Sequence, residues 1–148
     1  MQLIVLDHPK IWTDLAHISM KIHNNEGGSV FWFAHGCRYH SGVELFNCGR
    51  FFEAHEVLED LWRVAIDPER KYLQGLIQVA VALHHHSRGN LIGCRSLLAR
   101  AERNLRPYLP EYGGINVATL LNCLADWRAA FENSQPFPPL PTLIRAAK

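Results

Sequence analysis

The chain has no apolar run long enough to cross a bilayer. A transmembrane helix needs about 20 predominantly apolar residues in a row, and no stretch of the 148 residues comes close to that length. The apolar start, residues 1–6, has no basic residue before it and no small-residue cleavage site after it, which argues against a signal peptide. We therefore expect a cytoplasmic protein with no membrane partner.

Cysteine is scarce and scattered. The four cysteines, Cys37, Cys48, Cys94 and Cys123, contain no C-x-x-C pair, so the spacing predicts neither a metal clip nor a redox motif. No cysteine or serine follows the strand–turn–helix pattern of an activated nucleophile. We expect reduced thiols that mostly serve as packing residues, and we expect no nucleophilic triad.

No charge of one sign dominates the chain, whose formal net charge is +1. Locally the balance is uneven. Residues 44–69 carry seven acidic and two basic side chains, a net of −5, whereas residues 70–106 carry seven basic and one acidic, a net of +6. We interpret these blocks as solvated faces of neighbouring helices; a basic surface for an anionic partner is the alternative. No aromatic residue lies among the arginines of 95–106, so we do not expect nucleic acid as that partner.

Helical periodicity is what the sequence does contain. Gly49 and Gly89 mark helix ends, and Asn90 and Asn116 suit helix N-caps. We predict an all-α fold, a compact bundle of about five helices built from antiparallel helical hairpins. Apolar residues recur at three- and four-residue spacing over five segments, near 35–49, 51–65, 68–88, 90–110 and 116–131.

The third of these segments, 68–88, is apolar nearly all round, which predicts a central helix covered on several sides. The segments 51–65, 90–110 and 116–131 should also contribute residues to the core. We expect full burial of Phe51, Leu58, Trp62, Ile77, Val81, Leu98 and Leu124.

Two regions flank the helical body, which we place at 35–133 within a single domain, 1–148. Residues 1–34 form an N-terminal extension, in which apolar spacing predicts a short amphipathic helix at about 9–23. Residues 134–148 form a tail with four prolines between 135 and 141. Such a proline-rich segment should lie extended over the surface.

Polar residues interrupt the apolar sectors of two adjacent predicted helices. On a helical wheel, His55 and Glu59 fall inside the hydrophobic sector of 51–65, whereas a narrow polar stripe runs along 68–88. Buried polar groups cost free energy unless they are paired, and an antiparallel hairpin would bring the two sets together. We predict one largely buried cluster, with a hydrogen bond between His55 and Glu59 or from Gln78 to either. Its members are His55, Glu59, Gln74, Gln78 and, at its edge, His85.

The cluster permits several functions. A His and a Glu four residues apart can share a metal ion, and with His85 they would suit zinc, manganese or iron. However, the helical zinc-protease motif has a second His where this chain has Glu59. A metal-free ligand pocket and a hydrogen-bond network that fixes core packing explain the same residues.

We therefore expect a cytosolic binding or interaction module that forms a homo-oligomer. One kind of partner for such a module is a small-molecule ligand, which the sequence does not identify. The alternative is a metal-dependent hydrolase that uses His55, Glu59 and His85 with a divalent metal cofactor. Whether the protein is an enzyme is left open by the sequence.

The same residues carry a family resemblance. The run FNCGRFFEAHEVLEDLW at 46–62, the QGLIQ at 74–78, His85 and the Gly89-Asn90 pair resemble the signature of a bacterial and archaeal family, catalogued as a domain of unknown function, number 309. The resemblance covers about residues 38–110. It implies a small all-helical bundle and supports the choice of polar residues, but it implies no mechanism.

Overall fold

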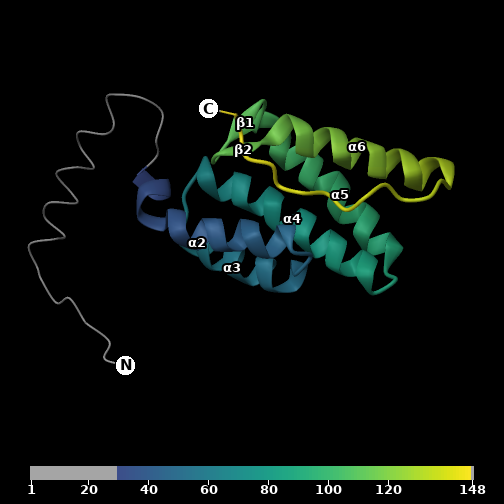
Figure 1. Cartoon of the computed structure of the whole chain (residues 1–148), viewed down its shortest axis with the longest axis horizontal. Helices are drawn as coiled ribbons and strands as arrows, with labels where there is room; N and C mark the ends of the chain where they lie inside the picture. Colours follow the sequence, from purple (N-terminus) through teal and green to yellow (C-terminus); the bar gives the residue numbers. More distant parts are fainter. Residues whose placement is uncertain (1–29, 148) are drawn as a thin grey trace, which may run out of the picture. The chain divides into compact units, whose positions relative to one another are not determined.

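The computed structural model describes residues 30–147. The chain divides into two units, residues 1–34 and 35–148. The helix predicted at 9–23 lies outside the described residues. The elements are α2 (Val30–Asn47), α3 (Phe51–Val64), α4 (Glu69–Ser87), α5 (Leu91–Leu105), the 3-10 turn η1 (Arg106–Tyr108), β1 (Glu111–Tyr112), β2 (Ile115–Asn116) and α6 (Val117–Asn133) (Figure 1).

The predicted all-α class is confirmed, with five α-helices and one two-stranded antiparallel ribbon among residues 30–147. The helix boundaries follow the local chemistry of the sequence. Gly49 (φ 78°) and Gly89 (φ 76°) adopt the left-handed conformation that commonly ends a helix. The side chains of Asn90 and Asn116 accept hydrogen bonds from the N–H groups of Gly93 and Thr119, both at 2.9 Å, and so cap α5 and α6 as predicted.

Helix α4 lies between α3 and α5 and packs extensively on both. The short connections on either side of α4 make each pair an antiparallel hairpin. Tyr72, Leu76 and Leu83 of α4 are fully buried, which confirms the prediction of a central helix. Close approach to α5 depends on Gly75, because a Cβ atom there would lie 2.6 Å from Leu105 Cγ.

The predicted core is partly confirmed. Phe51, Leu58, Leu98 and Leu124 are buried. The prediction was wrong for Trp62, Ile77 and Val81, which are only half-buried. These three side chains lie on a side of the α3–α4 hairpin that stays partly open to solvent within the described part of the chain.

The tail crosses back over the helices as an extended segment, as predicted, and it is firmly attached. The side-chain amide of Asn47 binds both backbone groups of Leu143, accepting from its N–H at 2.7 Å and donating to its carbonyl at 3.0 Å. Leu143 itself is buried. The tail is also attached to α6, where the indole N–H of Trp127 donates to the Pro139 carbonyl at 3.1 Å and the indole ring stacks on Phe137. The last residues therefore complete the core instead of merely lying on it.

No helix of residues 30–147 is both long enough and apolar enough to cross a bilayer.

Candidate functional site

His55 and Glu59 contact each other at ion-pair distance, where a hydrogen bond was predicted, and the contact is not deeply buried. Within α3, His55 Nε2 lies 3.2 Å from Glu59 Oε2, and His55 Nδ1 lies 3.0 Å from the Phe52 carbonyl oxygen. The side chains are 21% and 36% exposed, and Glu59 also pairs with Arg63 at 3.0 Å. The expectation of a largely buried pair was wrong, because α3 turns this flank toward the open side of the hairpin.

The other members of the predicted cluster do not join this pair. Gln74 is exposed. Gln78 faces α5, where its Oε1 accepts a hydrogen bond from Asn104 Nδ2 at 2.9 Å. His85 lies at the end of α4, with Nδ1 3.3 Å from Asn90 Nδ2. The prediction of one cluster was therefore wrong, because the polar stripe of α4 is turned away from α3, toward solvent and α5.

The metal-ligand set proposed from the sequence does not assemble either. Among residues 30–147, no group of three or more His, Cys, Asp or Glu side chains is arranged so that it could hold a metal ion. His55 and Glu59 thus remain a pair, without His85 as a third ligand.

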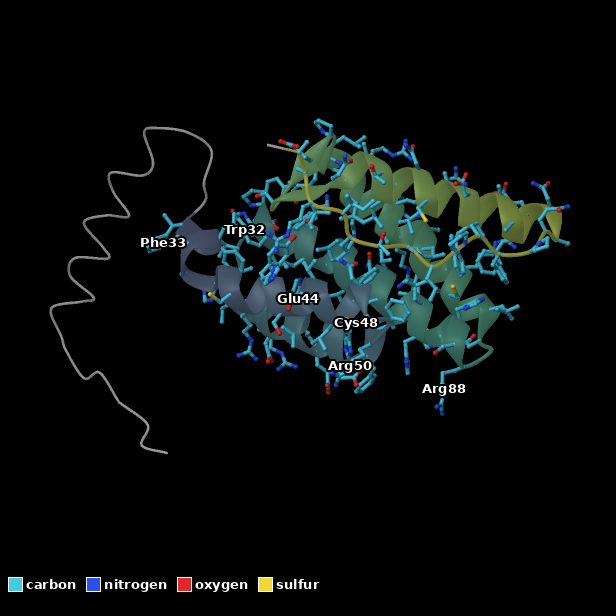
Figure 2. The ribbon with its side chains drawn as sticks, in the orientation of Figure 1. Trp32, Phe33, Glu44, Cys48, Arg50 and Arg88 are labelled. Atoms are coloured by element: carbon cyan, nitrogen blue, oxygen red, sulfur yellow. The ribbon has the colours of Figure 1, made fainter. Side chains whose placement is uncertain are left out.

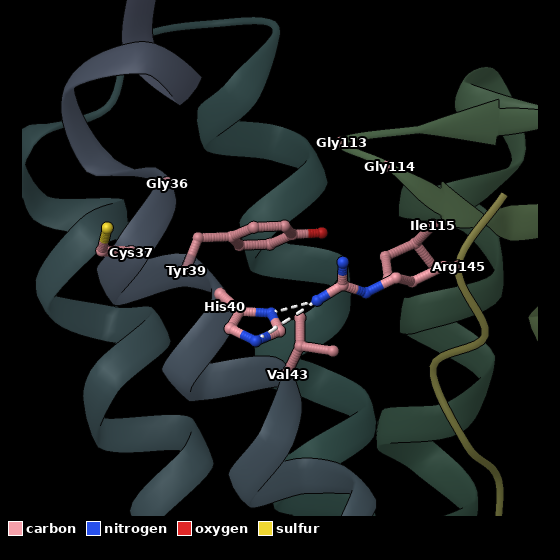
Figure 3. Close-up of a pocket in the computed structure, with 9 residues that line it drawn as sticks. All are labelled: Gly36, Cys37, Tyr39, His40, Val43, Gly113, Gly114, Ile115 and Arg145. Carbon is pink, nitrogen blue, oxygen red and sulfur yellow. Dashed lines mark hydrogen bonds between the residues drawn. The ribbon is translucent and has the colours of Figure 1, made fainter. Parts of the chain in front are cut away.

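A pocket of about 430 Å³ lies where α2 meets the β1–β2 turn and the tail (Figure 3). We call it the α2–tail pocket. Val43 and Ile115 provide apolar surface, and the paired glycines of the turn leave the opposite edge free of side chains. The lining residues are Gly36, Cys37, Tyr39, His40, Val43, Gly113, Gly114, Ile115 and Arg145.

A polar relay enters this pocket from α2 and the tail. His40 Nε2 lies 2.9 Å from Glu44 Oε1, one helical turn away. Arg145 Nη2 lies 2.6 Å from His40 Nδ1 (Figure 3). Arg145 Nη2 also lies 3.2 Å from His40 Nε2, so the guanidinium contacts both ring nitrogens of the imidazole. No carboxylate of residues 30–147 forms an ion pair with Arg145, so its charge is available to a ligand.

Tyrosine hydroxyls form a second relay behind the pocket wall. The hydroxyls of Tyr39 and Tyr72 are 2.9 Å apart, and the Tyr72 hydroxyl donates to the Tyr112 carbonyl at 3.1 Å. The Tyr39 hydroxyl is therefore the donor to Tyr72. Burial raises the pKa of both phenols well above the usual range. Both groups stay neutral near pH 7 and hold α2, α4 and β1 together behind the pocket.

The α2–tail pocket was not predicted from the sequence. One local signal was present, because His40 and Glu44 stand four residues apart on a predicted helix. The contribution of Arg145 could not be predicted from nearby residues, because Arg145 reaches the pocket from the tail, 105 residues after His40. Its position depends on the bridge between Arg145 and Ile115 of β2.

The described fold is that of a small all-α domain built on consecutive helical hairpins, with a pocket beside its C-terminal tail. Residues 39–97 match the family described as "Domain of unknown function (DUF309)". This match confirms the resemblance seen in the sequence: residues 39–97 carry a DUF309 domain. The matched segment contains α3, α4 and Tyr39 and His40 of the pocket, whereas the β1–β2 turn and the tail lie beyond it.

Two curated relatives are similar to the chain over part of their length. One is "Uncharacterized protein YpuF" of Bacillus subtilis (strain 168), which is 43% identical over 65 residues, covering 43% of this chain and 37% of the relative. The other is an "Uncharacterized protein" of Aquifex aeolicus (strain VF5), 32% identical over 92 residues, covering 62% of this chain and 28% of the relative. The chain therefore spans well under half the length of either protein.

Proposed function

We propose that this protein is a binding module that takes a small anionic ligand in the α2–tail pocket. The observation that carries the proposal is the Arg145 guanidinium, which borders a concave pocket and, within residues 30–147, has a histidine and no carboxylate as its polar side-chain partner. A guanidinium in such a place favours a carboxylate or phosphate group, because its planar set of N–H donors matches two acceptor oxygens.

The rest of the pocket suits such a ligand. A volume of about 430 Å³ lies within the range of small-molecule sites, roughly 300–1,000 Å³. Val43 and Ile115 offer apolar contact to the uncharged part of the ligand. His40 fixes one nitrogen of the guanidinium, so less side-chain freedom is lost when an anion binds. Glu44 in turn contacts His40 and is not among the lining residues.

Two exposed cysteines allow the charge preference of the pocket to be measured, because Cys37 lines the pocket and Cys48 does not. Cys48 lies just after the C-terminal end of α2 (Figure 2). We would treat the full chain with an anionic or a cationic methanethiosulfonate reagent of similar size and measure the modification rate at each cysteine by peptide mass spectrometry. The ratio of anionic to cationic rates reports the local preference for charge.

We expect this ratio to be higher at Cys37 than at Cys48. Arg145→Gln should lower it at Cys37 by about tenfold and leave Cys48 unchanged, since one close unit charge in a partly screened site contributes about 1 kcal/mol or more. Small carboxylates or inorganic phosphate should slow modification of Cys37 selectively. Equal ratios at the two cysteines, or a ratio at Cys37 that Arg145→Gln does not alter, would contradict the proposal.

A further inference from the structure

Within residues 30–147, the arginines of α5 form no ion pair, unlike the arginines of α2, of α3 and at the N-cap of α3. Arg38, Arg50 and Arg63 pair with Asp60, Glu53 and Glu59, respectively. By contrast, no ion pair forms within residues 30–147 at four exposed arginines along α5 and at its end. These are Arg95, Arg100, Arg103 and Arg106. The net positive charge of this part of the sequence is therefore not neutralised by the acidic block.

Two of these arginines border a groove between α5 and α6, which lie side by side (Figure 1). The groove has two hollows. One, of about 200 Å³, has Leu98, Ala99 and Phe131 in its lining, with Arg95 on the α5 side and Glu132 on the α6 side. The other, of about 240 Å³, has Leu109, Leu121 and Ala125 in its lining and Arg106 beside them.

An ion pair between Glu102 and Arg128, at 2.5 Å, lies between the hollows and lines both. The Glu102 side chain is buried, with only 8% of its surface exposed. Its charge is thus already matched from α6. Glu132 of α6, which also lines the hollow beside Arg95, has its Oε1 4.0 Å from Nε of the same Arg128, so neither acid forms an ion pair with Arg95 or Arg106. The groove therefore combines two apolar hollows with free positive charge on its α5 side.

We propose that this α5–α6 groove docks an amphipathic helix of a partner protein, with apolar anchors in the two hollows and acidic residues facing α5. Ala125 and Phe131, one from each hollow, are six residues apart on α6, about 9 Å along its axis, which is close to the spacing of about 10 Å between residues i and i+7 on a docked helix. Arg95 and Arg106 span about 16 Å, or about three helical turns, so acids near both ends of the docked helix would each meet an arginine.

The apolar hollows favour an acidic helix over a nucleic acid. A phosphate backbone uses basic groups but gains nothing from Leu98, Leu121 and Phe131. An acidic amphipathic helix uses both features of the groove. Its negative charge would also direct the approach of the partner, because complementary charge speeds the encounter and selects against wrong partners.

The probe is a fluorescently labelled synthetic helix of about three to four turns, with leucines at i, i+3 and i+7 and glutamates on one flank. The comparison peptide has lysine in place of every glutamate. Binding to the full chain is followed by fluorescence anisotropy at low and moderate salt. We expect saturable binding of the acidic peptide, weakened by salt, and much weaker binding of the basic one.

Matched variants locate the site. Arg95→Glu/Arg106→Glu changes two arginines that line the hollows, whereas Arg100→Glu/Arg103→Glu makes the same charge change on the same helix at residues that line neither. The first variant should weaken binding about tenfold or more, because it places like charges against the peptide. The second should change it much less. All four side chains are exposed, and circular dichroism checks that both variants remain folded.

Three outcomes would overturn the proposal. Equal binding of the two peptides would mean that the charge of the peptide does not affect binding. Equal weakening by the two variants would mean that only the overall charge of the protein matters. A short duplex DNA that binds the chain when the acidic peptide does not would assign the arginines to phosphate recognition instead. Since the groove shares no lining residue with the α2–tail pocket, these results do not depend on those at Cys37.

Discussion

The buried Tyr39–Tyr72 pair should make stability depend on pH in the alkaline range. Both phenols have a folded-state pKa well above the usual value of about 10, chiefly because of burial. Above about pH 10 the unfolded chain releases these protons and the folded chain keeps them, so stability is intact below that pH and falls above it. Each tyrosine should contribute a slope of up to about 1.4 kcal/mol per pH unit.

The measurement is the free energy of unfolding in urea from neutral to alkaline pH. In Tyr39→Phe/Tyr72→Phe we expect a shallower alkaline decline, with a loss of about 1 kcal/mol at neutral pH because the Tyr112 carbonyl loses its donor. Some decline should remain, since burial also raises the pKa of the Cys94 thiol, to about 11. An alkaline slope as steep as that of the unaltered chain would show that these phenols do not stay protonated in the fold.

Single residues also show how far the sequence could predict the site. The His55–Glu59 contact was predictable, because residues four apart on one helix meet whatever surrounds them. The contacts of Gln78 and His85 were not. A helical wheel fixes the direction of a side chain about its own helix axis, but it does not say which neighbour lies in that direction. Gln78 contacts Asn104 and His85 contacts Asn90, and both asparagines lie on the α5 side of α4.

At the scale of the helices, Gly75 sets how closely α4 and α5 can pack. Alanine is a better helix former than glycine by about 1 kcal/mol, so Gly75→Ala would stabilise an isolated helix. Here the added Cβ would lie 2.6 Å from the fully buried Leu105. Overpacking of this kind typically costs about 1–3 kcal/mol. We therefore expect Gly75→Ala to lower the free energy of unfolding by about 1 kcal/mol or more.

Gly36→Ala provides the matched control. It lies inside α2, and a Cβ there would meet nothing within 4 Å. The same substitution should stabilise the protein by about 0.4–1 kcal/mol, because only the unfolded chain loses freedom. Chemical denaturation of both variants gives the comparison. A stabilising Gly75→Ala would mean that α4 and α5 are not packed closely enough for Leu105 to clash with the added Cβ.

The helices themselves were predicted well because their ends depend on nearby residues. The helix ends are set by residues that act within one turn of their own position, so the local sequence is sufficient to predict where each helix ends. These residues are Gly49, Gly89, Asn90 and Asn116. Burial was predicted less well. Trp62, Ile77 and Val81 belong to apolar sectors, yet they are half-buried because that side of the α3–α4 hairpin stays partly open within residues 30–147. Periodicity identifies apolar faces, but coverage depends on where the other helices lie.

At the scale of the whole molecule, the tail links the two ends of the helical body and completes the α2–tail pocket. Composition alone predicted its extended form, because proline-rich segments do not continue a helix. It did not predict the attachment points, which are formed by residues far away in the chain. Asn47 of α2 holds Leu143, and Ile115 of β2 bridges to Arg145. The position of the Arg145 charge is therefore a property of the assembled fold.

This dependence yields a prediction that separates the function of the pocket from general stability. Asn47→Ala removes both hydrogen bonds to the Leu143 backbone and should cost about 1–3 kcal/mol. Because Arg145 follows Leu143 by two residues, loosening the tail should also move its guanidinium away from His40. We expect the anionic preference at Cys37 to fall in this variant, under conditions where the protein is still folded.

Asn104→Ala is the matched control. It also removes an asparagine side-chain hydrogen bond, to Gln78, but on the α4–α5 side of the molecule and away from the tail. It should lower the unfolding midpoint and leave the reagent ratio at Cys37 unaltered. If both variants lowered that ratio equally, the preference would follow stability in general. If neither did, Arg145 would keep its place without the Asn47 clamp, and the bridge to Ile115 would be sufficient to hold it in the pocket.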